Sequence, residues 1–171
     1  MRPKESGMLE SLSLIAAGFI GTELVSIPLH RYIFHGLLWN IHKSHHSPRH
    51  GLFEHNDLFS LFFATLSIAL MALGVFVPDM LSCFFIGLGV CFYGGVYFVV
   101  HDLMAHKRYY PLRPKNPILK GLVRAHRRHH QRVDQQGQGP WGLFLYRYDL
   151  HHAAPKSVRR LGVVGVELSE K

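Results

Sequence analysis

Cysteine is scarce in this sequence, and so are the motifs that bind common redox cofactors. The two cysteines, Cys83 and Cys91, lie eight residues apart within one apolar run. Eight helical residues span about 12 Å, which is too far for a disulfide bond. The sequence contains no flavin or nucleotide fingerprint, no haem-thiolate motif and no cysteine cluster. We therefore expect neither a disulfide nor a built-in flavin, haem or iron–sulfur group.

Charge is absent from two long stretches of the chain. Residues 58–77 and 80–100 contain no Asp, Glu, Lys or Arg, and residues 9–29 contain only Glu10 and Glu23. Apolar runs of about 20 residues match the hydrocarbon core of a bilayer, which is about 30 Å thick. The first run lacks the cleavage site of a removable signal peptide. We predict an all-α integral membrane protein with three to four transmembrane helices, at about 9–29, 58–77 and 80–100.

The basic residues are distributed unevenly around these runs. The net charge is +8, and every Lys and Arg except Arg2 and Lys4 lies within residues 31–49 or from residue 107 onward. The positive-inside rule places both segments in the cytoplasm and the N-terminus outside. This asymmetry explains the charge without a nucleic-acid partner. We expect one membrane-embedded domain over 1–171, with a cytoplasmic cap formed by 30–57 and 101–150 and a tail at 151–171.

Two parts of the cap have recognisable character. Residues 118–130 read as a basic amphipathic helix. Residues 141–148 are aromatic and apolar, too short to span a bilayer, and we expect them to lie at the interface or to re-enter the membrane.

Histidine is the abundant residue, with fourteen copies. Ten of them form two pairs and two triplets: His30 and His35; His42, His45 and His46; His101 and His106; His126, His129 and His130. Positions i, i+3 and i+4 share one face of an α-helix, so each triplet can present three imidazoles in one direction. Residues five apart are about 140° apart on an α-helix, so we do not expect the pairs to share a face. They could still flank a metal cluster, or the helix could end between them. The predicted topology places all ten on the cytoplasmic side.

The number and type of these side chains predict a metal centre. Neutral imidazole binds iron, zinc, copper and nickel, whereas calcium and magnesium require carboxylates, which are sparse here. A tetrahedral zinc ion needs only four ligands, so ten histidines indicate two ions with about five ligands each. Two irons fit this set, and two redox-silent zinc ions fit its geometry nearly as well and could occupy a purified sample. The other four histidines are expected at the surface: His50, His55, His151 and His152.

Five polar side chains near the motifs are candidates for orienting the histidines. Carboxylates and amides commonly hydrogen-bond the second nitrogen of a metal-binding imidazole. The candidates are Asp102, Glu54, Asn56, Asp57 and Glu23. An alternative role for Asn56 and Asp57 is capping of the helix that follows. Glu23 precedes His30 by seven residues, and intramembrane carboxylates are usually functional, so it could bind a histidine or contact another helix.

The residues around the histidines resemble those of the bacterial β-carotene 3-hydroxylases. The similar segments are 30–35 (HRYIFH), 39–46 (WNIHKSHH), 48–58 (PRHGLFEHNDL), 101–108 (HDLMAHKR), 125–130 (AHRRHH) and 144–146 (FLY). The resemblance covers about residues 23–146. It implies a non-haem di-iron monooxygenase that uses O2 to hydroxylate C3 of the β-ionone rings of β-carotene, giving β-cryptoxanthin and then zeaxanthin. It also implies ferredoxin as electron donor, and the lack of built-in redox groups calls for an external donor in any case.

Three other functions share parts of this pattern. A related hydroxylase or desaturase acting on fatty acyl or sterol substrates would use the same histidines with another pocket. A carotenoid ring ketolase would differ in the residues around the motifs. A non-catalytic metal-binding or transport protein is disfavoured because the second and third apolar runs offer no polar path for an ion.

Overall fold

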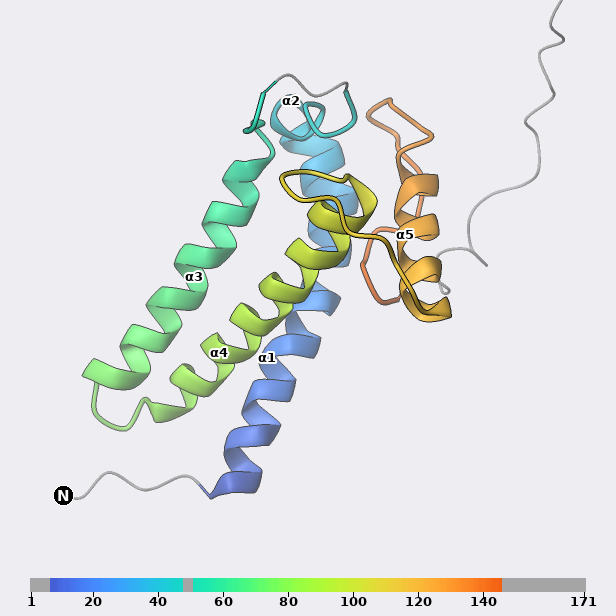
Figure 1. The fold of residues 1–171 in the computed structure, drawn as a ribbon. Coiled ribbons are helices and arrows are strands. Elements are labelled where there is room, and N and C mark those ends of the chain that lie inside the picture. Colours follow the sequence, from blue (N-terminus) through green and yellow to red (C-terminus); the bar gives the residue numbers. More distant parts are fainter. Residues whose placement is uncertain (1–6, 48–50, 146–171) are drawn as a thin grey trace, which may run out of the picture.

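The computed structural model describes residues 7–47 and 51–145, which form helices and connecting loops. In chain order, the elements are α1 (Met8–Pro28), η1 (Leu29–Leu37), α2 (Trp39–His42), α3 (Asp57–Phe76), α4 (Leu81–Tyr97), η2 (Phe98–Ala105) and α5 (Pro117–His129), where η denotes a π-helix (Figure 1). No strand occurs in these two described ranges, so the prediction of an all-α protein is confirmed there.

Three helices are long and apolar enough to cross a membrane. They are Met8–Leu37, Asp57–Phe76 and Leu81–Ala105. Most apolar side chains of the first two helices are exposed, as expected for helices surrounded by lipid, whereas most of those in the third are partly or fully buried. Three long apolar helices thus occur where the spans were predicted, but two of them end later than expected. The first and third helices continue past residues 29 and 100 as η1 and η2, which carry histidines.

Helix α4 lies between α1 and α3 and packs against both (Figure 1). Close approach to α1 depends on small residues, since a Cβ on Gly18 would meet the backbone of Ile86. Gly89 of α4 packs equally closely on the backbone of α1. Such small residues are how membrane helices approach one another without a hydrophobic driving force. The π-helix η2 then extends α4 toward the histidine end.

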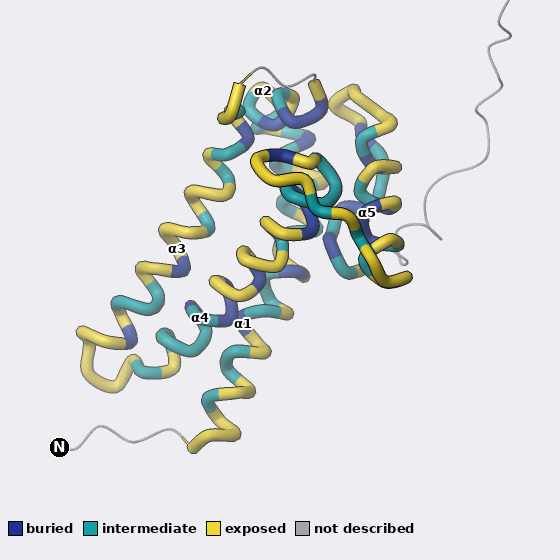
Figure 2. Tube along the Cα trace, in the orientation of Figure 1, coloured by how far each residue is buried: buried dark blue, intermediate teal, exposed yellow. Residues whose placement is uncertain are grey.

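Helix α5 lies across η2 at that end. Its first turn is capped by Asn116, whose Oδ1 accepts a hydrogen bond from the Leu119 N–H at 2.8 Å. Its apolar face contributes Leu122 and Val123 to a core completed by Val100 and Leu143. This agrees with the amphipathic helix predicted over 118–130. Figure 2 shows buried residues gathered where η1, η2, α2 and α5 meet.

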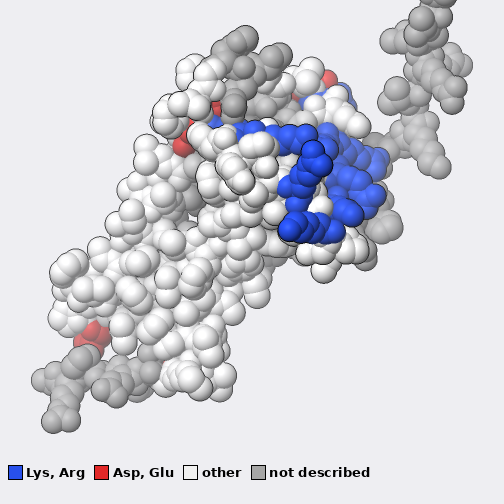
Figure 3. Space-filling model, viewed as in Figure 1, with Lys and Arg blue, Asp and Glu red and all other residues white. Residues whose placement is uncertain are grey.

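The segment after α5 returns to the transmembrane bundle. Within the predicted interfacial stretch 141–148, residues 141–145 are described, and Trp141 and Leu143 are buried. These residues pack against α1, as their contacts with Glu23 show. The exposed Lys and Arg side chains gather at the same end of the molecule as the histidines (Figure 3).

Candidate metal centre

The first histidine pair lies in the π-helix η1, and the second lies in η2 and at its C-cap, His106. In η1 and at the end of η2 the backbone bonds join residues five apart: Leu38 N–H donates to the Ile33 carbonyl at 2.7 Å, and His106 N–H to the His101 carbonyl at 2.9 Å. Residues five apart therefore lie one turn above each other. The ring centroids are 5.2 Å apart in His30–His35 and 4.6 Å apart in His101–His106. The expectation that the paired histidines do not share a face was wrong, because it assumed α-helical geometry.

The ten histidines come together in two groups. The first histidine group is His30, His35, His42, His46 and His129, whose candidate ligand atoms all lie within 4.8 Å of one another. The candidate ligand atoms of four further histidines also lie within 4.8 Å of one another: His45, His106, His126 and His130. His101 Nε2 lies 2.9 Å from His45 Nε2, so we include His101 in this second histidine group. Each group therefore offers five imidazoles to one ion.

Each triplet divides between the two groups instead of serving one. His42 and His46 face the first group, whereas His45, between them in sequence, faces the second. On α5, His129 faces the first group and its neighbour His130 the second. The triplets therefore hold the two groups next to each other, while each π-helical pair stays within one group.

Burial keeps these imidazoles in the neutral form that metal binding requires. Desolvation is the main cause, and neighbouring histidines add to it; together they lower the pKa of His42 to about 3, of His46 to about 4 and of His106 to about 2. The pKa values of His45, His126 and His129 are lowered well below the ordinary value for the same reasons. The Nε2 atom of His130 is buried and has no hydrogen-bond partner in the described ranges, so a metal ion would satisfy it. The donor set thus fits a transition metal.

The backbone of residues 135–145, which we call the strap, orients three histidines of the first group. Each donates from Nδ1 to a carbonyl oxygen, which leaves Nε2 facing the centre of the group. The pairs are His30 with Trp141 (2.9 Å), His35 with Gln135 (3.1 Å) and His129 with Gln138 (2.5 Å). The strap was not predicted to be part of the site. Gly137 has a φ of +57°, and a Cβ there would lie 2.6 Å from the His35 ring.

Side chains orient other histidines. His42 Nδ1 donates to Asn56 Oδ1 at 2.7 Å, and His45 Nδ1 lies 2.9 Å from Glu54 Oε1. Asn56 stands at the N-terminus of α3 but makes no side-chain cap hydrogen bond, so its side chain serves His42 and not the helix end. These are the contacts expected of residues that fix imidazole orientation.

Asp102 and Asp57 belong to the same network with different contacts. Asp102 Oδ2 lies 3.4 Å from His101 Nδ1. Asp57 hydrogen-bonds no histidine in the described residues; its Oδ2 accepts from the Glu54 N–H at 3.0 Å. Both carboxylates also bind Arg108. Asp57 therefore supports Glu54, which in turn contacts His45.

Arg108 is the buried cation that joins these carboxylates, and it was not among the predicted site residues. It is 4% exposed, and its guanidinium donates to Glu54, Asp57 and Asp102 at 2.7–3.1 Å. Burial alone would lower its pKa, but the hydrogen bond with Asp57 and the neighbouring negative charges raise the pKa above its ordinary value. The residues on either side of it have φ values of +54° and +52°. Three carboxylates near the motifs required such a counter-ion.

Glu23 contacts no histidine among the described residues. It is 4% exposed and accepts hydrogen bonds from the Tyr93 hydroxyl and from backbone N–H groups of the strap. Of its two predicted roles, contact with another helix is confirmed and direct bonding to a histidine is wrong. The reason is position: Glu23 lies two turns before His30, level with Tyr93 of α4.

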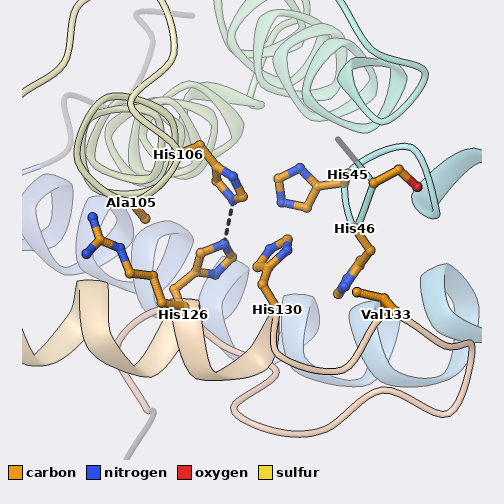
Figure 4. Close-up of a pocket in the computed structure, with 9 residues that line it drawn as sticks. His45, His46, Ala105, His106, His126, His130 and Val133 are labelled. Carbon is orange, nitrogen blue, oxygen red and sulfur yellow. Dashed lines mark hydrogen bonds between the residues drawn. The ribbon is translucent and has the colours of Figure 1, made fainter. Parts of the chain in front are cut away.

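A cavity of about 460 Å³ lies beside the second histidine group. Figure 4 shows His45, His106, His126 and His130 around it. The exposed residues Ser47, Arg127 and Val133 also line it, so it gives access from outside the protein. Among the four histidines outside the motifs, His55 is exposed as predicted, and His50, His151 and His152 lie outside the described residues.

Comparison with known proteins agrees with this picture of a membrane-embedded histidine centre. The chain belongs to the fatty acid hydroxylase family, whose model matches residues 15–156. A β-carotene 3-hydroxylase from Haematococcus lacustris chloroplasts is 39% identical over 162 residues, which are 88% of this chain and 48% of the relative. A β-carotene hydroxylase from Pantoea ananas is 45% identical over 129 residues, 74% of this chain and 71% of the relative.

A β-carotene hydroxylase from Pseudescherichia vulneris is 40% identical over 140 residues, which cover 81% of this chain and 78% of that protein. The chain thus spans about half the length of the chloroplast relative, and 71% and 78% of the length of the two bacterial ones. No solved structure matches it.

Proposed function

We propose that this chain is a di-iron monooxygenase that hydroxylates C3 of each β-ionone ring of β-carotene, giving β-cryptoxanthin and then zeaxanthin. The observation that carries the proposal is the division of ten histidines, six of them buried and four partly buried, into two adjacent groups of five. Similarity to β-carotene 3-hydroxylases over most of the chain supports the carotenoid substrate.

The reaction consumes O2, two electrons and two protons for each ring. One oxygen atom enters the C–H bond, and the other leaves as water. Two iron ions held by the histidine groups would supply the O2 activation that protein side chains lack. Zinc in the same positions would give an inactive protein, because zinc has no accessible redox change.

The residues of the chain prepare the site in three ways. Burial keeps the imidazoles neutral, so each offers a lone pair. Asn56, Glu54 and the strap fix which nitrogen of each ring faces inward. With the three long apolar helices in a bilayer, the histidine groups would lie next to the membrane, where a neutral hydrocarbon such as β-carotene dissolves.

Electrons must come from outside, since the sequence has no motif for a flavin, haem-thiolate or iron–sulfur group. We propose ferredoxin as the donor. We also propose that the histidine end faces the cytoplasm, because Lys and Arg collect there (Figure 3). A membrane-impermeant thiol reagent applied to intact cells would test this orientation: a cysteine placed at exposed Lys120 should be protected, and its labelling would contradict the proposal.

Expression in bacteria that accumulate β-carotene tests the proposed reaction. Separation of the pigments should show β-cryptoxanthin and zeaxanthin. His129→Ala and His45→Ala remove one member of each histidine group and should abolish both products, whereas His55→Ala changes an exposed histidine outside the groups and should not. Iron-supplied, folded protein that forms no hydroxylated carotenoid would overturn the proposed substrate. Full activity of the two group variants would overturn the metal-binding role.

A further inference from the structure

Glu23 is a buried carboxylate inside the transmembrane bundle, and its hydrogen-bond partners come from two other parts of the chain. Tyr93 Oη of α4 donates to Oε2 at 2.6 Å. The other three donors are consecutive strap amides: Leu143 (3.2 Å), Phe144 (2.8 Å) and Leu145 (2.9 Å). An ionised carboxylate accepts about four hydrogen bonds and donates none, so these four donors satisfy it. Glu23 therefore joins α1 and α4 to the end of the strap.

The same strap touches the first histidine group two residues earlier. The Trp141 carbonyl accepts the hydrogen bond from His30 Nδ1 at 2.9 Å, and the Trp141 ring lies against the His30 and His35 rings. Gly142, between Trp141 and the bound amides, packs so closely that an added Cβ would lie 2.6 Å from Glu23 Oε1. The position of the Trp141 carbonyl is thus set by how Glu23 holds the following three amides.

We propose that Glu23 and Tyr93 form an intramembrane clamp that positions His30 through the strap. They are positioning residues, since neither contacts a histidine of the groups by hydrogen bond. The proposal rests on the proposed metal binding. It assigns the buried carboxylate of α1 a role in holding the first histidine group in the geometry that one metal ion needs.

The clamp acts on one group and not on the other. The strap supplies carbonyl partners to His30, His35 and His129, all in the first group. His45 of the second group is oriented by Glu54 instead. Loss of partners that orient metal ligands typically lowers metal affinity about 10- to 100-fold. Breaking the clamp should therefore weaken one metal site and leave the other nearly unchanged, a selectivity that general loosening of the fold would not produce.

Hydrogen exchange in the metal-free protein tests the clamp itself. Tyr93→Phe removes one hydrogen bond at constant shape, and Glu23→Gln replaces one acceptor oxygen by a donor. Ser67→Ala is the control, because Ser67 is equally buried and donates to the Gly87 carbonyl between α3 and α4. The amides of residues 143–145 should exchange about 10- to 100-fold faster in Glu23→Gln than in the wild-type protein. Their exchange rates should not change in Ser67→Ala. Unchanged exchange in Glu23→Gln overturns the proposal.

Mössbauer spectra and iron content of protein loaded with iron-57 test the link to His30. In Glu23→Gln we expect the iron of the first histidine group to be lost to a chelator and its Mössbauer signal to change. The iron of the second group should be retained and should keep its signal. Gly142→Ala should act in the same direction, and Gly21→Ala, whose added Cβ meets nothing within 4 Å, should not. Equal loss from both sites, or no loss, overturns the link. If the wild-type protein binds no iron, the proposed function is refuted. The hydrogen-exchange rates of residues 143–145 would still show whether Glu23 holds the strap.

Discussion

Replacement of Arg108 by methionine removes the only buried cation from a cluster of three carboxylates in the described part of the chain. The side chains of Arg108, Glu54 and Asp102 are 5%, 8% and 8% exposed, so little water can replace the lost hydrogen bonds. Breaking a buried ion pair by removing one partner costs about 3–5 kcal/mol, because the remaining charge stays buried. We therefore expect a large loss of stability and not merely the loss of one contact.

The loss should be measurable as a shift in thermal unfolding. For a chain of this size, 1 kcal/mol corresponds to about 2–4 °C, so Arg108→Met should lower the midpoint by about 6–20 °C. Tryptophan fluorescence of the detergent-solubilised, metal-free protein would follow the transition. Arg132→Met is the matched control, since the Arg132–Asp134 pair is 44% and 55% exposed and should contribute little.

A second variant separates charge from packing. Adding Asp57→Asn to Arg108→Met removes one of the uncompensated negative charges and should recover part of the lost stability. If Arg108→Met unfolds at the same temperature as Arg132→Met, the carboxylates do not depend on Arg108 and the reasoning is refuted. If the double variant is less stable than Arg108→Met alone, lost packing and not charge dominates.

Three further predictions concern the first histidine group. Asn56→Ala removes the acceptor for His42 Nδ1 and should weaken metal binding about 10- to 100-fold in chelator competition. Gly137→Ala introduces a Cβ 2.6 Å from the His35 ring and should lower metal content by elemental analysis. Burial lowers the pKa of His42 to about 3 and of His46 to about 4, so below pH 6.5 the unfolded chain binds more protons. Metal-free protein should lose stability as the pH falls from 7 to 5.

Each of these has a control and a contradicting result. Asn56→Asp keeps an acceptor oxygen and should bind metal far better than Asn56→Ala; equal affinities would remove Asn56 from the site. Gly36→Ala meets no atom within 4 Å and should keep its metal, which makes crowding at position 137 the tested cause. Stability that stays flat between pH 7 and pH 5 would show that the buried histidines take up protons as readily in the folded protein.

The approximate lengths of the long apolar helices could be predicted, because the thickness of the hydrocarbon core sets how many apolar residues a spanning helix needs. The second span was expected at 58–77 and is helical over Asp57–Phe76, bounded by Asn56 on one side and Pro78 on the other. The first and third helices extend further than expected, to Leu37 and Ala105. Histidine ends a hydropathy run but does not end a helix, so composition alone could not locate those ends.

The histidines of the site could be named from sequence, but only the side-chain partners among their contacts could be. Asn56 and Glu54 were recognisable because side-chain amides and carboxylates are the usual partners of metal-binding imidazoles. The strap carbonyls were not, since every residue has a carbonyl and only the fold decides which one meets His30 or His129. Arg108 lay within reach of prediction, because buried carboxylates need a compensating cation.

The π-helical turns bear on which changes of length the chain tolerates. His30 and His35 come together because the i→i+5 hydrogen bonds of a π-helix bring residues five apart to one side of the helix. Deletion of one residue between them would leave a spacing of four, which an ordinary α-helix also aligns. Every later residue, however, would rotate by about 100° and shift by about 1.5 Å relative to α1. The triplet that joins the two groups would then face elsewhere, so these segments should accept substitutions at their lipid-facing positions far more readily than insertions or deletions.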